Sequence, residues 1–243
     1  MARVSNPPFD QEAPEGPGTA GVWIFDLDNT LYPASCDLFP QIDRRMKHFI
    51  ARYLDVPPDE AHRVQKAYYR RFGTTLRGLM LMHGLEPRRF LDYVHAIDLS
   101  GLAPDPRLDA ALAGLPGRKL VFTNSSERHA GAVLDRLGIA RHFEGVFDIQ
   151  AADFVPKPQP ETYARLAERH AIEPRDAVLV DDLIRNLAPA AAIGMTTVWV
   201  RHPAHEEAHT HPDDDALPGH VHVVTEDLVA WLQGRAGPAS AVS

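Results

Sequence analysis

The chain has 243 residues, 44% of them hydrophobic, and a formal net charge of −8. This length suits one moderately large domain or a core with one inserted module, and the composition excludes a fibrous, collagenous or wholly disordered protein. Lys and Arg are scattered along the chain rather than gathered in blocks, which argues against a nucleic-acid polymer as a partner.

The first 20 residues are rich in Pro and Gly and predict a disordered leader without the apolar core of a signal peptide. No later run approaches the roughly 18 apolar residues that indicate a membrane span. Cys36 is the only cysteine, so no internal disulfide can form. We therefore expect a soluble cytoplasmic protein that has no membrane partner.

Short apolar runs predict the strands. The first run, Val22 to Phe25, stops at Asp26. Later runs follow at residues 120–122, 146–147, 177–180 and 197–200. Continuous apolar runs of this length are typical of strands buried on both faces, as in a parallel sheet. A final short strand is expected at 221–224, followed by a closing helix through Trp231.

Helical patterns separate the later strands. Apolar residues keep helical spacing after Ser126, where Gly138 supplies a stop, and again after Pro160. Asn186 is placed to cap a third, short helix with Pro189 in its first turn. Alternating strands and helices indicate an α/β fold built on a doubly wound parallel sheet.

Residues 33–104 interrupt this alternation and predict an inserted helical module. Their apolar positions form three helical stripes, at 38–53, 61–72 and 90–97. The α/β core then comprises residues 21–32 and 105–235, and we expect residues 236–243 to form a disordered tail.

Two acids stand at the end of the first strand. Asp26 closes the apolar run and Asp28 follows two residues later, so in an extended chain both side chains can face one site. Two close carboxylates repel each other unless a cation lies between them, and Mg²⁺ prefers such oxygen ligands. The pair therefore predicts a magnesium site, with a pair of ordinary turn residues as the alternative reading of an isolated Asp-x-Asp.

Other polar residues follow the neighbouring strands. Asp181 and Asp182 end the fourth predicted strand. Thr123 and Asn124 end the second, directly before a helix start, where backbone donors and the helix dipole favour an anion. Lys157 lies between two prolines that stiffen the backbone. Each of these residues alone has an ordinary explanation as a cap or a solvated charge, but together they predict a phosphate site.

These motifs and their order resemble the four motifs of the haloacid-dehalogenase-like (HAD) superfamily of hydrolases. The residues that carry the resemblance are Asp26-Leu27-Asp28-Asn29-Thr30-Leu31-Tyr32, Thr123-Asn124, Lys157 and Asp181-Asp182. They span nearly all of residues 22–200. The resemblance implies a Rossmann-like core, and the helical module at 33–104 resembles the type-1 cap of that superfamily.

The resemblance implies that Asp26 is a nucleophile that forms an aspartyl-phosphate. Asp28 would protonate the leaving alkoxide and later deprotonate the attacking water, so we expect a raised pKa for Asp28. Expulsion of a halide needs neither a proton nor a metal, and the acid at Asp28 therefore favours phosphate esters over haloacids.

The resemblance also implies how a Mg²⁺ cofactor and the phosphate are held. The metal ligands would be Asp26, the backbone carbonyl of Asp28, Asp182 and, as a further acid, Asp181. Asn186 stands where the superfamily often carries another Asp, which concerns only the supporting ligands. The groups that hold and stabilise the phosphate would be Thr123, Asn124 and Lys157.

Within the helical module, residues 68–79 and His83 resemble pyrimidine 5′-nucleotidases of the fungal and bacterial type. Tyr69, Arg77 and His83 are candidates for binding the leaving group, because Tyr stacks on a base while Arg and His donate to a pyrimidine carbonyl. Alternatively, Arg77 pairs with an acid of the module and Tyr68 belongs to its apolar core. The implied substrates are UMP and CMP, which are small phosphorylated metabolites.

Two other functions stay open. One is a phosphatase of the same fold for another small ester, such as a sugar phosphate or phosphoglycolate, and only the segment at 68–79 speaks against it. The other is a catalytically idle binding domain that retains the fold. The complete set of catalytic residues speaks against this second alternative.

Overall fold

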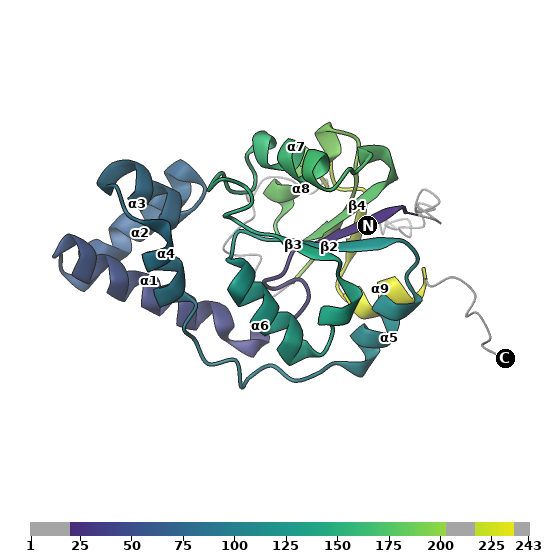
Figure 1. The fold of residues 1–243 in the computed structure, drawn as a ribbon, viewed down its shortest axis with the longest axis horizontal. Helices are drawn as coiled ribbons and strands as arrows, with labels where there is room; N and C mark the ends of the chain where they lie inside the picture. Colours follow the sequence, from purple (N-terminus) through teal and green to yellow (C-terminus); the bar gives the residue numbers. More distant parts are fainter. Residues whose placement is uncertain (1–19, 203–216, 236–243) are drawn as a thin grey trace, which may run out of the picture.

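Six parallel strands form one sheet in the order β3-β2-β1-β4-β5-β6 in the computed structural model, which describes residues 20–202 and 217–235 (Figure 1). The strands are β1 (Val22–Phe25), β2 (Arg118–Phe122), β3 (Gly145–Phe147), β4 (Ala177–Asp181), β5 (Thr196–Val200) and β6 (Val223–Thr225). The chain starts in the middle of the sheet, adds strands on one side, and returns to the other side of β1. The predicted doubly wound parallel sheet is therefore confirmed, and ligands of such sheets bind where this reversal occurs.

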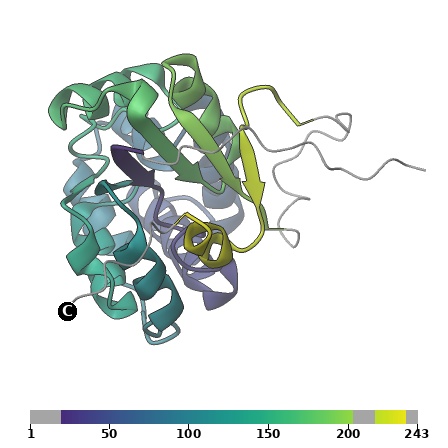
Figure 2. The same cartoon turned by 90° about the vertical axis from the view of Figure 1, so that its right-hand side faces the viewer.

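Helices cover both faces of the sheet (Figure 2). One face carries α5 (Pro106–Gly114), α6 (Glu127–Leu137) and α9 (Leu228–Gln233), and the other carries α7 (Pro160–Arg169) and α8 (Ile184–Ala192). Three short 3-10 helices complete the description: η1 (Ala34–Cys36), η2 (Ala140–His142) and η3 (Pro174–Asp176). In β1, Trp23 and Phe25 pack into one layer while Val22 and Ile24 pack into the other. Because both faces of the sheet are buried against apolar layers, successive residues of a strand are all hydrophobic, which explains the unbroken hydrophobic runs.

Four helices between β1 and α5 form a separate bundle beside the sheet, on the left of Figure 1. They are α1 (Leu38–Leu54), α2 (Pro58–Phe72), α3 (Thr75–His83) and α4 (Pro87–Val94). Three of them match the predicted stripes, whereas α3 was not predicted as a helix of its own. A Cβ added at Gly78 of α3 would lie 2.5 Å from the Cβ of Tyr68, so the close packing of α2 and α3 requires glycine there. We call this bundle the cap.

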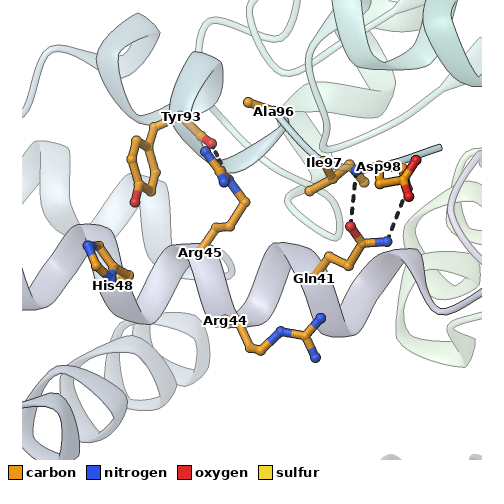
Figure 3. A pocket seen from close by; sticks show the side chains of 8 residues that line it. All are labelled: Gln41, Arg44, Arg45, His48, Tyr93, Ala96, Ile97 and Asp98. Carbon is orange, nitrogen blue, oxygen red and sulfur yellow. Dashed lines mark hydrogen bonds between the residues drawn. The ribbon is translucent and has the colours of Figure 1, made fainter.

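The segment that returns the chain from the cap to the core, residues 93–98, is fastened to α1 (Figure 3). Gln41 accepts a hydrogen bond from the Asp98 backbone N–H and donates one to its carbonyl, both at 3.0 Å. Nε of Arg45 donates to the Tyr93 carbonyl at 2.7 Å, and its guanidinium carbon lies 4.5 Å from the centroid of the Tyr93 ring. These contacts, which we call the hinge clamp, fix the return segment to the cap.

The prediction that Asn186 caps α8 is wrong. The helix begins at Ile184, so Asn186 lies in its first turn and Pro189 in its second. The cause lies in the preceding strand, where the Asp181 carboxylate accepts the backbone N–H of Leu183 at 2.9 Å. That bond starts the turn earlier and directs the Asn186 side chain back to the same carboxylate, 2.9 Å away.

The expected disordered leader at 1–20, apart from Ala20, and the expected tail at 236–243 lie outside the described residues. The final strand and helix of the described part, β6 and α9, agree with the predicted strand at 221–224 and the helix through Trp231. Across residues 20–202 and 217–235, no helix is both long enough and apolar enough to span a membrane.

Candidate active site

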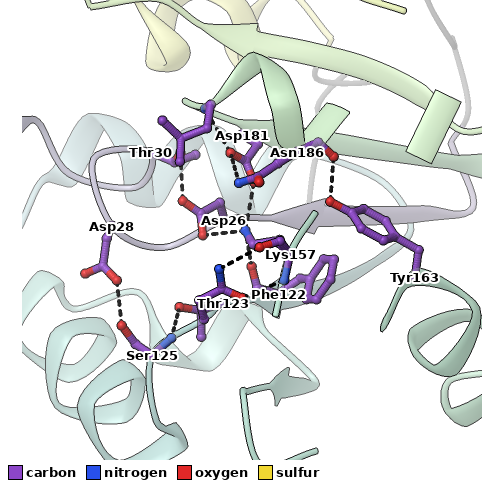
Figure 4. Close-up of polar contacts among 12 residues, drawn as sticks. Asp26, Asp28, Thr30, Phe122, Thr123, Ser125, Lys157, Tyr163, Asp181 and Asn186 are labelled. Atoms are coloured by element: carbon purple, nitrogen blue, oxygen red, sulfur yellow. Dashed lines mark hydrogen bonds and ion pairs between the residues drawn. The ribbon is translucent and has the colours of Figure 1, made fainter. Parts of the chain in front are cut away.

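The carboxyl ends of three adjacent strands bring polar residues together. Asp26 follows β1, Thr123 follows β2 and Asp181 is the last residue of β4. Since β1 lies between β2 and β4, these side chains meet at one edge of the sheet, as the sequence predicts (Figure 4). The Asp26 N–H donates to the Val180 carbonyl at 2.8 Å, which continues the β1–β4 pairing and places the Asp26 side chain.

Lys157 occupies the centre of this group and is only 1% exposed. Its ammonium donates to Oδ1 of Asp26 at 2.8 Å, to Oδ2 of Asp181 at 2.7 Å and to the Phe122 carbonyl at 2.9 Å (Figure 4). Burial by itself lowers the pKa of Lys157, but the two carboxylates outweigh burial and raise this pKa above its ordinary value. Because all three N–H bonds are used, Lys157 contributes fixed positive charge to the site.

Asp181 is held in place from several sides. It is fully buried, and besides Lys157 and the Leu183 N–H it accepts the Asn186 side-chain amide at 2.9 and 3.1 Å. The Tyr163 hydroxyl in turn donates to the Asn186 carbonyl at 2.6 Å. Asn186 therefore supplies a hydrogen-bond donor where a further Asp would have supplied another negative charge.

A metal ion fits the acids of this site. One carboxylate oxygen each from Asp26, Asp181 and Asp182 lies within 4.8 Å of the other two. Burial raises the pKa of Asp26 to about 7, against the effect of Lys157 and with that of the neighbouring acids. Burial, followed by Asp26 and Asp181, also raises the pKa of Asp182 well above its ordinary value. Three carboxylates beside one ammonium leave negative charge uncompensated, and an all-oxygen donor set of this kind suits a hard divalent cation.

The raised pKa expected for Asp28 is wrong for this structure. Burial does raise the pKa of Asp28, but hydrogen bonds and charge from its neighbours lower it well below its ordinary value. Oδ1 accepts the Tyr32 hydroxyl at 2.5 Å and lies 3.3 Å from Nε2 of His129, while Oδ2 accepts the Ser125 hydroxyl at 2.8 Å. Groups that bind the carboxylate stabilise its ionised form.

Sequence reasoning missed these three partners of Asp28. Tyr32 is the last residue of the first recognised motif and Ser125 directly follows the second, but the sequence analysis gave neither a bond to Asp28. His129 gives no local signal, because it lies on α6 and reaches Asp28 only through the fold.

The predicted phosphate-binding residues take different roles. Thr123 is 2% exposed, and its hydroxyl oxygen accepts the Ser125 N–H at 2.9 Å. Asn124 pairs with the backbone of Lys157 in both directions, accepting its N–H at 2.8 Å and donating to its carbonyl at 3.3 Å. Asn124 thus positions the loop that carries Lys157.

The three candidates on the cap are spread over two helices. Tyr69 meets the core, where the Arg185 guanidinium of α8 hydrogen-bonds its hydroxyl and lies 4.6 Å from its ring centroid. Nη1 of Arg77 is buried without a hydrogen-bond partner, and among the described residues no acid forms an ion pair with this side chain. His83 ends α3 in an exposed position, with Nε2 2.6 Å from the hydroxyl of Tyr68, a partly buried member of the cap's apolar cluster.

Several known proteins are similar in sequence to this chain. It is 30% identical to phosphate metabolism protein 8 of Saccharomyces cerevisiae over 192 residues, which are 72% of this chain and 59% of that protein. It is 27% identical to the glyceraldehyde 3-phosphate phosphatase of Methanopyrus kandleri over 209 residues, 79% of this chain and 88% of that protein. Over 117 residues it is 32% identical to the fructose-1-phosphate phosphatase YqaB of Escherichia coli, covering 47% of this chain and 61% of that protein. The chain thus spans about three fifths of the yeast and E. coli proteins.

Solved structures share the fold. A HAD phosphatase from Thermococcus onnurineus matches with a TM-score of 0.58 and 19% identity, covering 88% of this chain and 96% of that one. The L-2-haloacid dehalogenase of Xanthobacter autotrophicus matches with a TM-score of 0.55 and 17% identity, covering 88% and 98%. The sequence model of haloacid dehalogenase-like hydrolases matches residues 22–194, which include all four motifs and the cap. The chain therefore belongs to the haloacid dehalogenase-like hydrolase family.

Proposed function

We propose that this protein is a Mg²⁺-dependent phosphomonoesterase that hydrolyses pyrimidine nucleoside 5′-monophosphates, UMP and CMP, in the cytoplasm. The observation that carries the proposal is the contrast between two acids at the end of β1. Asp26 has Oδ1 bound to Lys157, whereas within the described part of the chain Oδ2 has only the Thr30 hydroxyl at 3.5 Å and is available as a nucleophile. Both oxygens of Asp28 are oriented by donors, as a proton-transfer group requires.

Oδ2 of Asp26 attacks phosphorus and forms an O–P bond while the bond from phosphorus to the ester oxygen breaks. The leaving alkoxide takes a proton from the carboxylic acid of Asp28. Water then attacks the aspartyl-phosphate at phosphorus and returns a proton to Asp28, releasing inorganic phosphate and free Asp26. Because the neighbours of Asp28 favour its carboxylate form, the negative charge of the bound phosphate is needed to bring Asp28 to its acid form.

Mg²⁺ would be held by Asp26 and Asp182, with Asp181 in support, and by the Asp28 carbonyl that the resemblance implies; it would supply positive charge for the nucleophile and the phosphoryl oxygens. Thr123 is suited to bind a phosphoryl oxygen, because its hydroxyl accepts from Ser125 and keeps its own proton to donate. Lys157 acts through its charge, since its N–H groups already bind Asp26, Asp181 and Phe122.

The substrate assignment is supported by the cap. The segment at 68–79 resembles pyrimidine 5′-nucleotidases, and within it Arg77 carries a buried N–H group without a partner. A buried donor of this kind costs free energy unless an acceptor reaches it, and a pyrimidine carbonyl oxygen is such an acceptor. Tyr69, at the contact between cap and core, offers an aromatic face close to the core.

A second candidate is a phosphatase for a sugar phosphate or another small ester. The names of two relatives favour it, since one is a fructose-1-phosphate phosphatase and the other a glyceraldehyde 3-phosphate phosphatase. Both candidates use the same core residues and differ only in what the cap accepts.

Phosphate release from UMP, CMP, AMP, GMP, ribose 5-phosphate, fructose 1-phosphate and phosphoglycolate, with Mg²⁺ or EDTA, tests the proposal. We expect UMP or CMP to lead in kcat/KM by about tenfold or more and EDTA to stop the reaction. Preference for a sugar phosphate selects the second candidate. Asp26→Asn should abolish turnover while the fold is retained; substantial activity in that variant, or no Mg²⁺-dependent hydrolysis by the wild type, would mean that the catalytic assignment is wrong.

A further inference from the structure

His95 and His129 form a contact between the cap and the core. His95 directly follows α4, and its ring stacks on that of His129 in α6, with centroids 4.4 Å apart and planes inclined by 19°. Nδ1 of His95 also lies 2.9 Å from the hydroxyl oxygen of Ser126, the residue that caps α6. Burial, followed by His129, lowers the pKa of His95 to about 3, so this ring is uncharged in neutral solution.

The same His129 ring contacts Asp28, the general acid of the proposed reaction. Its side chain is 1% exposed, and Nε2 lies 3.3 Å from Oδ1 of Asp28. The backbone N–H of His129 donates to the Ser126 hydroxyl at 3.4 Å, which fixes the start of the helix. The imidazole of His129 is thus packed between a residue of the return segment and the Asp28 carboxylate.

The hinge clamp fixes the segment that contains His95 to the cap. Tyr93 and Asp98, on either side of His95, are bound to Arg45 and Gln41 of α1 (Figure 3). Ser126 and His129 belong to the core. A shift of the cap against the core therefore separates the two stacked rings, whereas packing of the cap on the core joins them.

We propose that His95 and His129 are positioning residues that align Asp28 for proton transfer when the cap packs on the core. The inference deepens the proposed phosphatase function and rests on it. The His95 ring restricts the rotamer of His129, and His129 together with Tyr32 fixes Oδ1 of Asp28. Proton delivery to the leaving group is thereby tied to cap closure, which also excludes water from the bound ester.

The test compares two leaving groups. An alkoxide needs a proton when it departs, whereas p-nitrophenolate leaves without one, so formation of the aspartyl-phosphate depends on an aligned Asp28 only for the first substrate. Hydrolysis of the intermediate uses Asp28 for both substrates, and kcat/KM is therefore compared because it reports the first step. We expect His95→Ala to lower kcat/KM for a nucleoside or sugar phosphate by about tenfold or more, with a much smaller change for p-nitrophenyl phosphate. His95→Phe keeps a stacked ring. It should therefore recover most of the kcat/KM for the nucleoside or sugar phosphate that His95→Ala loses.

His48 provides a matched control, since it stacks on Tyr93 with ring centroids 6.2 Å apart, inside the cap. His48→Ala should leave the ratio of the two substrates unchanged. Equal losses on both substrates in His95→Ala, or no loss on either, would overturn the positioning role. If the wild type hydrolyses no ester, the phosphatase proposal fails, but the contact itself still predicts faster amide hydrogen exchange at 123–130 in His95→Ala. Unchanged exchange there overturns the inference independently of activity.

Discussion

The ammonium nitrogen of Lys157 lies 2.8 Å from Oδ1 of Asp26, and their side chains are only 2% and 10% exposed. When a charged pair is this little exposed to water, loss of either partner lowers the stability of the fold, because the remaining charge is left without compensation. The same ammonium lies 2.7 Å from Asp181, so one cation holds two acids in register at the ends of β1 and β4.

Replacement of Lys157 by Met removes this charge while keeping a long side chain. We expect the metal-free variant to lose about 3 kcal/mol of unfolding free energy, measured by urea denaturation in EDTA. Mg²⁺ should restore part of the loss, because a bound cation again compensates the acids. Lys119→Met is the control, since Lys119 is buried and its bonds to other described residues go to the carbonyls of Leu115 and Gly117, not to an acid. An equal effect of Mg²⁺ on both variants would contradict the role given to Lys157.

The raised pKa of Asp26 predicts how stability depends on pH and metal. In the metal-free native state the pKa is about 7 instead of 3.8, so between these values the native chain holds a proton that the unfolded chain has released. The contribution of Asp26 to stability is therefore present at low pH and lost as pH rises through 7. Mg²⁺ competes with that proton, so the rise in Tm on adding Mg²⁺ should grow from about pH 5 to about pH 8.

Asp26→Asn is the reference for this measurement, because an amide at this position does not titrate. The part of the pH dependence that Asp26 contributes should disappear in the variant, whereas the part that comes from the raised pKa of Asp182 remains. A metal-induced rise in Tm that stays constant over the whole range in the wild type would contradict the assignment of Asp26 as a ligand.

Asn186 should influence metal binding without touching the metal. Its amide donates to both oxygens of Asp181, so Asn186→Leu frees that carboxylate to rotate. Loss of such an orienting partner typically weakens metal affinity, and we expect an increase of about tenfold in the Mg²⁺ concentration for half-maximal activity. In Tyr163→Phe the lost bond reaches only the Asn186 carbonyl, and the Mg²⁺ requirement should stay near that of the wild type. An unchanged requirement in Asn186→Leu would show that Lys157 and Leu183 alone suffice to hold Asp181.

Two glycine substitutions should act in opposite directions. In Gly78→Ala the new methyl group would lie 2.5 Å from Tyr68, so α2 and α3 must separate, and we expect a loss of about 1–3 kcal/mol from overpacking. Gly131 of α6 has open space around it, and Gly131→Ala should stabilise the protein by about 0.5–1 kcal/mol through helix propensity. Thermal or urea denaturation of both variants measures the contrast, and a neutral Gly78→Ala would show that α2 and α3 separate without cost.

The sequence was sufficient to predict the parallel sheet. It was also sufficient to predict that Asp26, Thr123 and Asp181 lie close together. Apolar runs buried on both faces leave a clear pattern, and the geometry of a parallel sheet then brings its strand ends together. The start of α5 also carried its signal, since Asp105 caps the helix with Pro106 at its first position, although this helix was not predicted.

The surroundings of individual acids could not be predicted in this way. The ionisation of Asp28 depends on Tyr32, Ser125 and His129, of which two lie about a hundred positions away in the chain. Likewise, Asn186 resembles a helix cap in the sequence, and only the position of Asp181 shows why its amide turns to the strand instead. The sequence patterns of strands and helices are local, whereas tertiary packing determines which groups surround a buried charge.

The central place of β1 has a consequence for the order of events during synthesis. Val22 pairs with Arg118 on one side and with Ala177 on the other, so the strand that carries the nucleophile leaves the ribosome long before either neighbour exists. The helices of the cap are complete in the meantime, with an apolar cluster drawn almost wholly from their own residues. Contacts this distant along the chain form late, and β1 must remain unpaired until they do. A nascent chain that ends before β4 thus contains Asp26 but no active site.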